Sequence, residues 1–244
     1  MISVSEVAKV FEDGTVALEN VSFEVKKGES CAIIGESGCG KSTLLLILAG
    51  LLKPTRGEVI IDGSIVTKPM KNVSLILQDY GLFPWKNVYD NIALGLRIRR
   101  VGRDEIRRKV SSLINRLGLE GFERHYPKQL SGGMRQRVAF ARALATNPEI
   151  LLMDEPFSSL DALSRENLQN FLLKLWQENK ITMVLVTHSI EEAVFLGKRI
   201  VVLTPRPGKV KAIVENPMAG SLDYRYREEY FRKCREIRRI IEAT

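Results

Sequence analysis

Three short stretches of the chain are apolar at every position. They are residues 31–34, 150–153 and 183–186. A strand with one solvated face alternates apolar and polar side chains, so these uninterrupted runs predict strands that are buried on both faces. Helical patterns follow them at residues 42–52, 162–179 and 190–196. Repetition of strand and helix predicts an α/β fold built on a parallel sheet.

Two further regions have different patterns. Short strands bounded by turns are expected at residues 4–11, 21–25 and 58–62, and they predict an added antiparallel layer. Residues 90–124 have a helical pattern with a basic run at 97–109, and they predict a helical lobe inserted into the α/β part.

We therefore expect one domain over residues 1–244. Its α/β lobe would occupy about residues 1–85 and 145–220, with the helical lobe at about 86–144. An amphipathic C-terminal helix is expected at about residues 223–242.

Composition narrows the class of protein. The 244 residues are 45% hydrophobic and 27% charged, which is typical of a globular domain, and the net charge of +8 favours polyanionic partners. The spacing of Cys31, Cys39 and Cys234 fits neither a zinc site nor a disulfide framework. The first residues do not have the pattern of a signal peptide, and the apolar run at 44–52 is too short to cross a bilayer. Any membrane association is thus expected to occur through a partner.

Residues 35–42 match the phosphate-binding pattern G-x-x-x-x-G-K-[ST] between a buried strand and a helix. The glycines let backbone N–H groups converge on phosphate oxygens, and the start of the helix presents its positive end to them. We expect Lys41 to reach the β- and γ-phosphates and the Ser42 hydroxyl to hold Mg²⁺. A plain glycine-rich turn is the alternative. The expected phosphate-binding residues are Gly35, Glu36, Ser37, Gly38, Cys39, Gly40, Lys41, Ser42 and Thr43.

Cys39 lies inside this loop. We expect it to be a small residue whose backbone faces the phosphate, and a redox switch is the alternative interpretation.

A second apolar strand ends in two acids, Asp154 and Glu155. Asp154 is positioned to hold Mg²⁺ directly or through water, and Glu155 to polarise an attacking water as general base. The alternative is a solvated strand end.

Residues 130–137, Leu-Ser-Gly-Gly-Met-Arg-Gln-Arg, resemble the signature of the ATP-binding cassette (ABC) family. Met134 replaces the commonest glutamine of that signature. Ser131, Gly132 and Gly133 would open a helix and offer a hydroxyl and N–H groups to an anion.

Further residues fit the family's remaining motifs. The resemblance implies that Gln78 joins the Mg²⁺ site to the helical lobe, that Asp161 lies in the loop that contacts the opposite subunit, and that His188 contacts the γ-phosphate. It also implies that Phe11 stacks on adenine, although a core phenylalanine in a strand is the alternative.

The resemblance implies a P-loop NTPase core of the RecA-like type and hydrolysis of ATP to ADP and phosphate. It also implies two cassettes paired head to tail, with ATP between Lys41 of one chain and Ser131 of the other. Integral-membrane permease subunits would be separate chains that a solute-binding protein contacts, and the cassette would lie on the cytoplasmic face of the membrane.

Residues 81–85 and 205–210 resemble the nitrate/sulfonate/taurine importer ATPases, whose relatives carry small anions or thiamine-pyrimidine-like compounds. Phe83 and Trp85 are expected to form an exposed docking patch for the permease, and burial in the helical lobe is the alternative.

An ABC-type ATPase acting on nucleic acid is the alternative function, because the chain is basic. Repair members of that class carry a long coiled coil and translation-associated members carry two cassettes, and neither feature is present here. A small-molecule kinase would not need residues 130–137. We therefore expect no nucleic-acid partner, and the run at 97–109 is expected to be a solvated face near anionic lipid heads.

Overall fold

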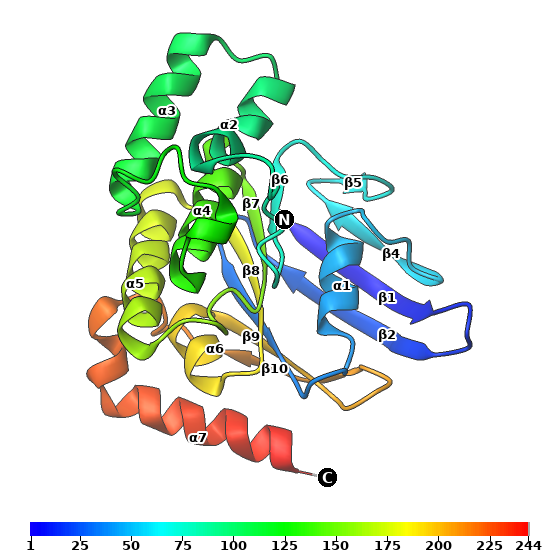
Figure 1. The fold of residues 1–244 in the computed structure, drawn as a ribbon. Helices are drawn as coiled ribbons and strands as arrows, with labels where there is room; N and C mark the ends of the chain where they lie inside the picture. The colour runs from blue at the N-terminus through cyan, green and yellow to red at the C-terminus, as the bar shows by residue number, and fades with distance from the viewer. Residues whose placement is uncertain (244) are drawn as a thin grey trace.

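The computed structural model describes residues 1–243 and contains two β-sheets and seven α-helices in that range. The six-stranded sheet has the order β10-β9-β3-β8-β7-β6 (Figure 1). Its strands are β3 (Ser30–Ile34), β6 (Val73–Ile76), β7 (Ile150–Asp154), β8 (Thr182–Thr187), β9 (Arg199–Leu203) and β10 (Val210–Glu215). All neighbours in it pair parallel except β10, which is antiparallel to β9. The predicted parallel core is thus present, with an edge strand added.

The second sheet has four strands in the order β2-β1-β4-β5, and all of them pair antiparallel. They are β1 (Ile2–Val10), β2 (Val16–Val25), β4 (Arg56–Ile61) and β5 (Ser64–Ile65). This is the antiparallel layer that the alternating N-terminal segments predict.

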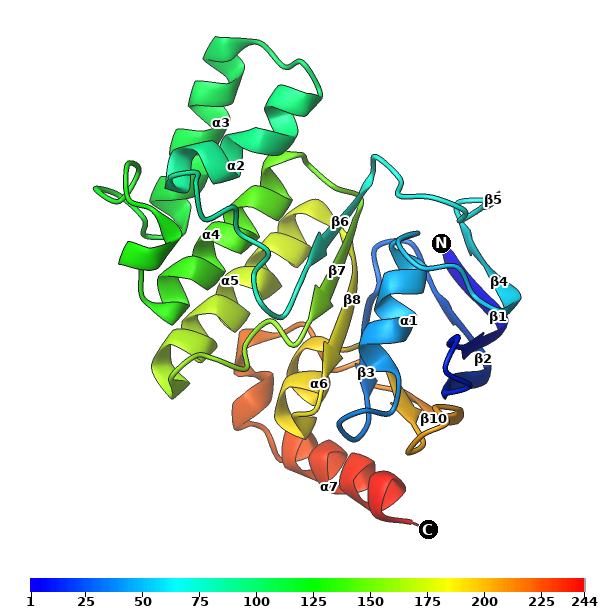
Figure 2. The same cartoon turned by 45° about the vertical axis from the view of Figure 1, so that its right-hand side comes forward.

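The helices divide between the two faces of the parallel sheet. They are α1 (Lys41–Leu48), α2 (Val88–Ile98), α3 (Arg103–Arg116), α4 (Gly132–Ala145), α5 (Ala162–Asn179), α6 (Ile190–Leu196) and α7 (Glu228–Glu242). Helix α1 packs with the antiparallel strands in one apolar cluster, whereas α2 to α6 share the other cluster (Figure 2). The parallel strands contribute to both clusters because both of their faces are covered.

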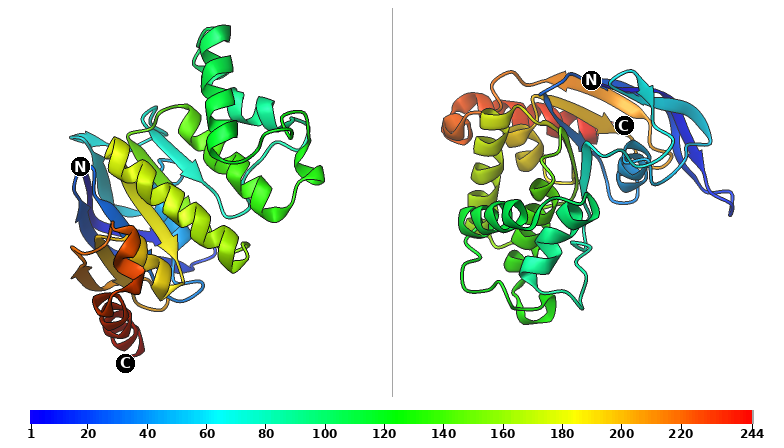
Figure 3. Two further views of the ribbon diagram at one scale, coloured as in Figure 1. Left: turned by 90° about the vertical axis from the view of Figure 1, so that its left-hand side faces the viewer. Right: turned by 90° about the horizontal axis from the view of Figure 1, so that it is seen from above.

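Helices α2 and α3 stand away from the antiparallel sheet (Figure 3). They pack on α4, which in turn contacts β6 of the parallel sheet. Arg142 of α4 also connects this helix to the segment between β6 and α2. Its guanidinium donates to the carbonyl oxygens of Gly81 at 2.5 Å and Tyr80 at 2.7 Å.

Several expected element boundaries differ from those in the structure. Strand β2 begins at Val16 rather than at residue 21. Helix α1 ends at Leu48 rather than at residue 52, because Gly50 takes the left-handed φ of 70°. The C-terminal helix begins at Glu228, since Leu222–Tyr226 form a 3-10 turn fixed by the Tyr224 hydroxyl, which donates to Asn216 Oδ1 at 2.7 Å. Strand β1 ends at Val10, so Phe11 lies in the turn that follows.

Candidate active site

The loop at residues 35–40 joins β3 to α1 and turns sharply at its glycines. Gly38 and Gly40 have φ values of 78° and 101°, which favour glycine. A Cβ on Gly40 would also lie 2.6 Å from the carbonyl oxygen of Ala17. The loop therefore brings the backbone close to β2 and opens the N-terminus of α1, the geometry of an anion-binding loop.

Lys41 begins α1 and is only 5% exposed. Its Nζ donates to the carbonyl oxygens of Gly35 and Glu36, each at 2.8 Å. Burial raises the pKa of the adjacent Cys39 thiol, and a reactive cysteine needs a lowered one. The structure thus favours the interpretation of Cys39 as a small buried residue over that of a redox switch.

Ser42 and Asp154 meet across the gap between α1 and the end of β7. The Ser42 hydroxyl donates to Asp154 Oδ1 at 3.1 Å, and burial raises the pKa of that carboxyl group. Hydroxyl and carboxylate oxygens beside a phosphate loop suit Mg²⁺, which commonly binds through one or two carboxylates and substrate phosphates. Within residues 1–243 no group of three acidic, histidine or cysteine side chains is placed to hold a metal ion.

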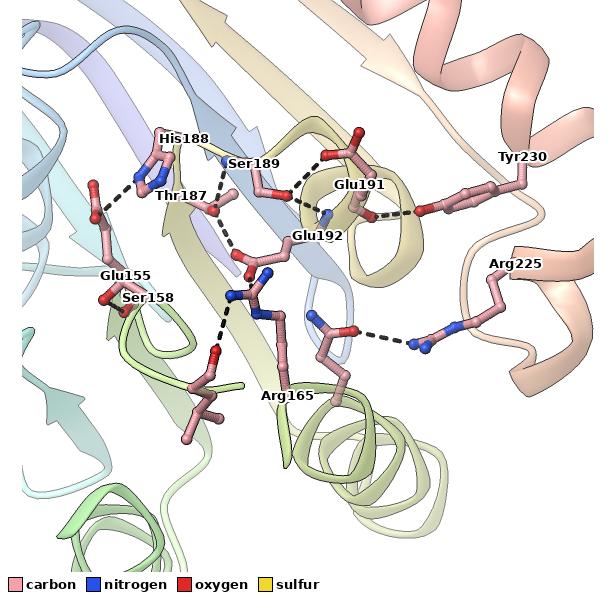
Figure 4. A network of polar contacts seen from close by, with 12 residues as sticks. Glu155, Ser158, Arg165, Thr187, His188, Ser189, Glu191, Glu192, Arg225 and Tyr230 are labelled. Carbon is pink, nitrogen blue, oxygen red and sulfur yellow. Dashed lines mark hydrogen bonds and ion pairs between the residues drawn. The ribbon is translucent and has the colours of Figure 1, made fainter. Parts of the chain in front are cut away.

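Glu155 follows β7 with a φ of 44°, a left-handed conformation that is uncommon for a non-glycine residue. Its backbone N–H donates to Val186 of the neighbouring strand at 2.9 Å. Its Oε2 lies 3.1 Å from Nδ1 of His188, and the Glu155 side chain is 15% exposed (Figure 4). The turn thus places the Glu155 carboxylate beside His188.

A polar network around the buried Glu192 carboxylate holds the loop that carries His188 (Figure 4). The Thr187 hydroxyl donates to Glu192 Oε2 at 2.6 Å and accepts from the backbone N–H of Ser189 at 3.0 Å. Glu192 is 6% exposed, and burial raises the pKa of its carboxyl group. Arg165 lies 3.9 Å from that carboxylate and donates to the Leu160 carbonyl at 3.0 Å. The network therefore ties the start of α5 to the His188 loop, and the sequence analysis did not predict it.

One cavity of about 300 Å³ collects ten of the expected site residues. They are Phe11, Ser37, Gly38, Gly40, Lys41, Ser42, Thr43, Gln78, Glu155 and His188. Phe11 is 39% exposed, so the structure favours its interpretation as an accessible ring over that of a core residue. Thr15, Ala17 and Arg206 complete the lining, and the sequence analysis did not predict them as site residues. Of the three, only Arg206 lies in a segment that the sequence analysis singled out, residues 205–210.

Seven expected nucleotide-binding residues do not line this cavity. Three of them, Gly35, Glu36 and Cys39, belong to the phosphate loop itself, and the other four, Ser131, Gly132, Gly133 and Asp161, lie elsewhere. Ser131 caps α4, where its hydroxyl accepts from the Met134 N–H at 3.3 Å, and Asp161 caps α5, where its carboxylate accepts from the Ser164 N–H at 2.9 Å. Helix α4 packs on the face of the parallel sheet opposite α1. Within one chain these residues therefore form a second surface.

The sequence profile of the ABC transporter family matches residues 18–158, more than half of the chain. The chain belongs to the ABC transporter family. It is an ATP-binding cassette with ATPase function, as the phosphate loop and the signature at residues 130–137 predict.

Curated relatives in this family are closely similar. An aliphatic sulfonates import ATP-binding protein, SsuB of Bacillus cereus, is 48% identical over 220 residues, which cover 89% of this chain and 86% of the relative. A taurine import ATP-binding protein, TauB of Burkholderia thailandensis, is 50% identical over 196 residues, covering 80% of this chain and 75% of the relative.

Solved structures of cassettes share the fold. The cassette MJ0796, described as a dimer in a post-hydrolysis state with ADP and phosphate, has a TM-score of 0.81 and 36% identity, with coverage of 88% of this chain and 98% of that one. CbiO1 of Clostridium perfringens, part of an ABC transporter complex, has a TM-score of 0.77 and 28% identity, covering 97% and 94%. The P-loop NTPase fold predicted from the sequence is confirmed.

Proposed function

We propose that this cassette hydrolyses ATP to drive uptake of a small sulfonate anion through a separate permease. The observation that carries the chemistry is the single cavity lined by Lys41, Ser42, Glu155 and His188, in which Ser42 also bonds to Asp154 and Glu155 contacts His188. The import direction and the sulfonate class are inferred from the relatives that import aliphatic sulfonates and taurine.

Each group in the cavity has a distinct role in this proposal. Lys41 and the loop N–H groups bind the β- and γ-phosphates, and Phe11 stacks on the adenine. Ser42, Asp154 and Gln78 would hold Mg²⁺, which would supply neutralisation of phosphate charge. Glu155 accepts a proton from the attacking water.

His188 contacts the γ-phosphate and orients Glu155 through their 3.1 Å contact. Because the two act on the same reacting group, replacement of either is expected to reduce turnover.

We also propose that two copies of the chain pair head to tail. The signature residues Ser131, Gly132 and Gly133 lie outside the Lys41 cavity of their own chain, which leaves them available to the cavity of a second chain. The similarity to a dimeric cassette with ADP and phosphate supports this arrangement. Asp161 would contact the opposite chain beside them.

Membrane attachment would occur through the permease. No helix within residues 1–243 has the length and apolarity needed to cross a bilayer. Trp85 is 71% exposed, and its ring lies 5.5 Å from that of Phe83 in an edge-to-face contact. The Arg142 guanidinium lies 6.0 Å from the centre of the Phe83 ring, a further contact that holds Phe83. These two rings are the proposed docking patch, which would place the cassette at the cytoplasmic face with a solute-binding protein outside.

The test is sulfonate-dependent transport. Cells that lack their own sulfonate importers receive this chain with its cognate permease and solute-binding protein, and uptake of labelled taurine and of labelled ethanesulfonate is measured. Uptake of either sulfonate that disappears with Glu155→Gln supports the proposal, and the preferred solute identifies the subclass. Uptake that persists in the Glu155→Gln variant would contradict the proposal. ATPase activity without uptake of either solute would also contradict it.

A further inference from the structure

The loop between β9 and β10, residues 204–209, is held against the phosphate loop. The Thr204 N–H donates to the Lys209 carbonyl at 2.9 Å, and the Gly208 N–H donates to the Ala17 carbonyl at 3.0 Å. A Cβ on Gly208 would lie only 2.1 Å from the carbonyl oxygen of Cys39, so the two loops pack backbone to backbone. The loop is therefore a fixed wall of the nucleotide cavity.

Arg206 is the cation that this wall presents to the cavity. Its Nε donates to the carbonyl oxygen of Gly38 at 3.0 Å, and the side chain lines the cavity together with Lys41 and Ser42. In the described part of the chain no carboxylate lies within ion-pair distance of Arg206. A guanidinium has five N–H donors, so four remain beyond the Gly38 contact.

The cavity needs positive charge for its ligand. A nucleoside triphosphate carries several negative charges, and Lys41 and Arg206 are the lysine and arginine side chains that line the cavity. The planar fork of arginine matches phosphate oxygens, and its charge-assisted hydrogen bonds are stronger than neutral ones.

We propose that Arg206 is a nucleotide-binding residue whose guanidinium binds a phosphate group of the nucleotide held by the Lys41 loop. The assignment depends on the phosphate-binding role proposed for that loop. It adds a cation supplied by the β9–β10 loop, more than 160 residues along the chain from the phosphate-binding motif. The contact serves binding of ATP and ADP and does not take part in proton transfer.

Arg206 has one competing role, which is to brace the Gly38 carbonyl. The two roles are separable because glutamine carries its amide nitrogen the same number of bonds from Cα as the Nε of arginine. Arg206→Gln keeps a donor for Gly38 and removes the charged end, whereas Arg206→Lys keeps a charge and moves the donor away from the Nε position.

The experiment measures the dissociation constant of ATP and of ADP by calorimetry on the purified full chain, at about 0.05 M and 0.5 M salt. Arg206→Gln is expected to raise both constants about tenfold at low salt, the loss of one charge-assisted phosphate contact. The ratio to the unsubstituted chain should shrink toward about threefold at high salt, because screening weakens an exposed charge. Arg206→Lys is expected to bind more tightly than Arg206→Gln.

Three results would overturn the assignment: unchanged affinity in Arg206→Gln, a loss that is the same at both salt concentrations, or weaker binding in Arg206→Lys than in Arg206→Gln. Lys209→Gln is the matched control, since Lys209 lies in the same loop but pairs with Glu19 at 3.0 Å outside the cavity lining. Lys41→Ala tests the loop itself. If Lys41→Ala leaves the affinity for ATP unchanged, the Lys41 loop is not the phosphate site. If Lys41→Ala weakens ATP binding but Arg206→Gln does not, the phosphate site is correct and the assignment of Arg206 is wrong.

Discussion

The hydrogen bond between Thr187 and Glu192 gives a direct test of how the His188 loop is held. Both residues are almost fully buried, at 1% and 6% exposed, and the hydroxyl donates to the carboxylate at 2.6 Å. Thr187→Val keeps the shape of the side chain and removes the donor. A hydrogen bond to a charged group contributes about 1.5–3 kcal/mol, and a buried acceptor left short of a partner adds to the loss. Arg165 at 3.9 Å can compensate only in part, so we expect the free energy of unfolding to fall by about 2–3 kcal/mol.

The loss should depend on pH. Burial raises the pKa of Glu192, and the Thr187 hydrogen bond opposes that rise, so the substitution moves the pKa further upward. Near or below the ordinary glutamate pKa of about 4.3, Glu192 is protonated in both the variant and the unsubstituted chain. The missing hydrogen bond then lowers the free energy of unfolding by less. Above the folded-state pKa the carboxylate is ionised without its donor. The difference in stability between the variant and the unsubstituted chain should therefore grow as pH rises from about 5 to 8.

The assay is denaturant unfolding, followed by tryptophan fluorescence, at about pH 5 and at about pH 8. Thr182→Val is the matched control, because Thr182 is 3% exposed on the same strand and its hydroxyl accepts from the neutral Gly28 N–H at 2.9 Å. The control should lose about 1 kcal/mol at either pH. A loss in Thr187→Val no larger than that in Thr182→Val at about pH 8, or a loss that is equal at about pH 5 and about pH 8, would contradict this prediction.

Three other substitutions test separate parts of the site. Lys41→Ala should raise the dissociation constant of ATP at least about tenfold in calorimetry, and unchanged binding would remove Lys41 from the phosphate site. Gly208→Ala should lower the melting temperature by several degrees and weaken ATP binding, because its Cβ would lie 2.1 Å from the Cys39 carbonyl; a melting curve like that of the unsubstituted chain would show that the loops can separate freely. The double variant Phe83→Ala, Trp85→Ala should keep basal ATPase within about threefold and lose co-purification with the permease, since exposed aromatic anchors serve interfaces; loss of basal activity would instead make the rings part of the folded core.

Local signals were sufficient to predict two helices to the residue. Helix α5 spans Ala162–Asn179 and α6 spans Ile190–Leu196, as expected from the sequence. Asp161 and Ser189 begin them as N-caps, and the capping interaction involves residues only three positions apart. Such short-range contacts are visible in a sequence.

Long-range contacts account for what the sequence did not predict. The 3-10 turn before α7 depends on Tyr224 and Asn216, and Arg206 lines the cavity from a loop whose Gly208 packs closely on Cys39. The residue pattern predicts that Asp154 and Glu155 differ in role, but the φ of Glu155 that places its carboxylate beside His188 is a property of the folded strand end. The helix and strand propensities of the residues do not predict such contacts between segments far apart in the chain.

We propose that ATP joins two chains and that Glu155 then activates the water that cleaves it. The most direct measurement is sedimentation velocity of the Glu155→Gln variant with ATP and Mg²⁺, together with its rate of ATP hydrolysis. We expect a monomer without nucleotide, a dimer with ATP, and hydrolysis slower by at least about 10²-fold, the low end for loss of a general base. Adding Ser131→Arg should abolish the dimer, because it places bulk and charge on the surface that faces the second cavity. A Glu155→Gln chain that stays monomeric with ATP at high concentration, or that hydrolyses ATP at the normal rate, would contradict the account.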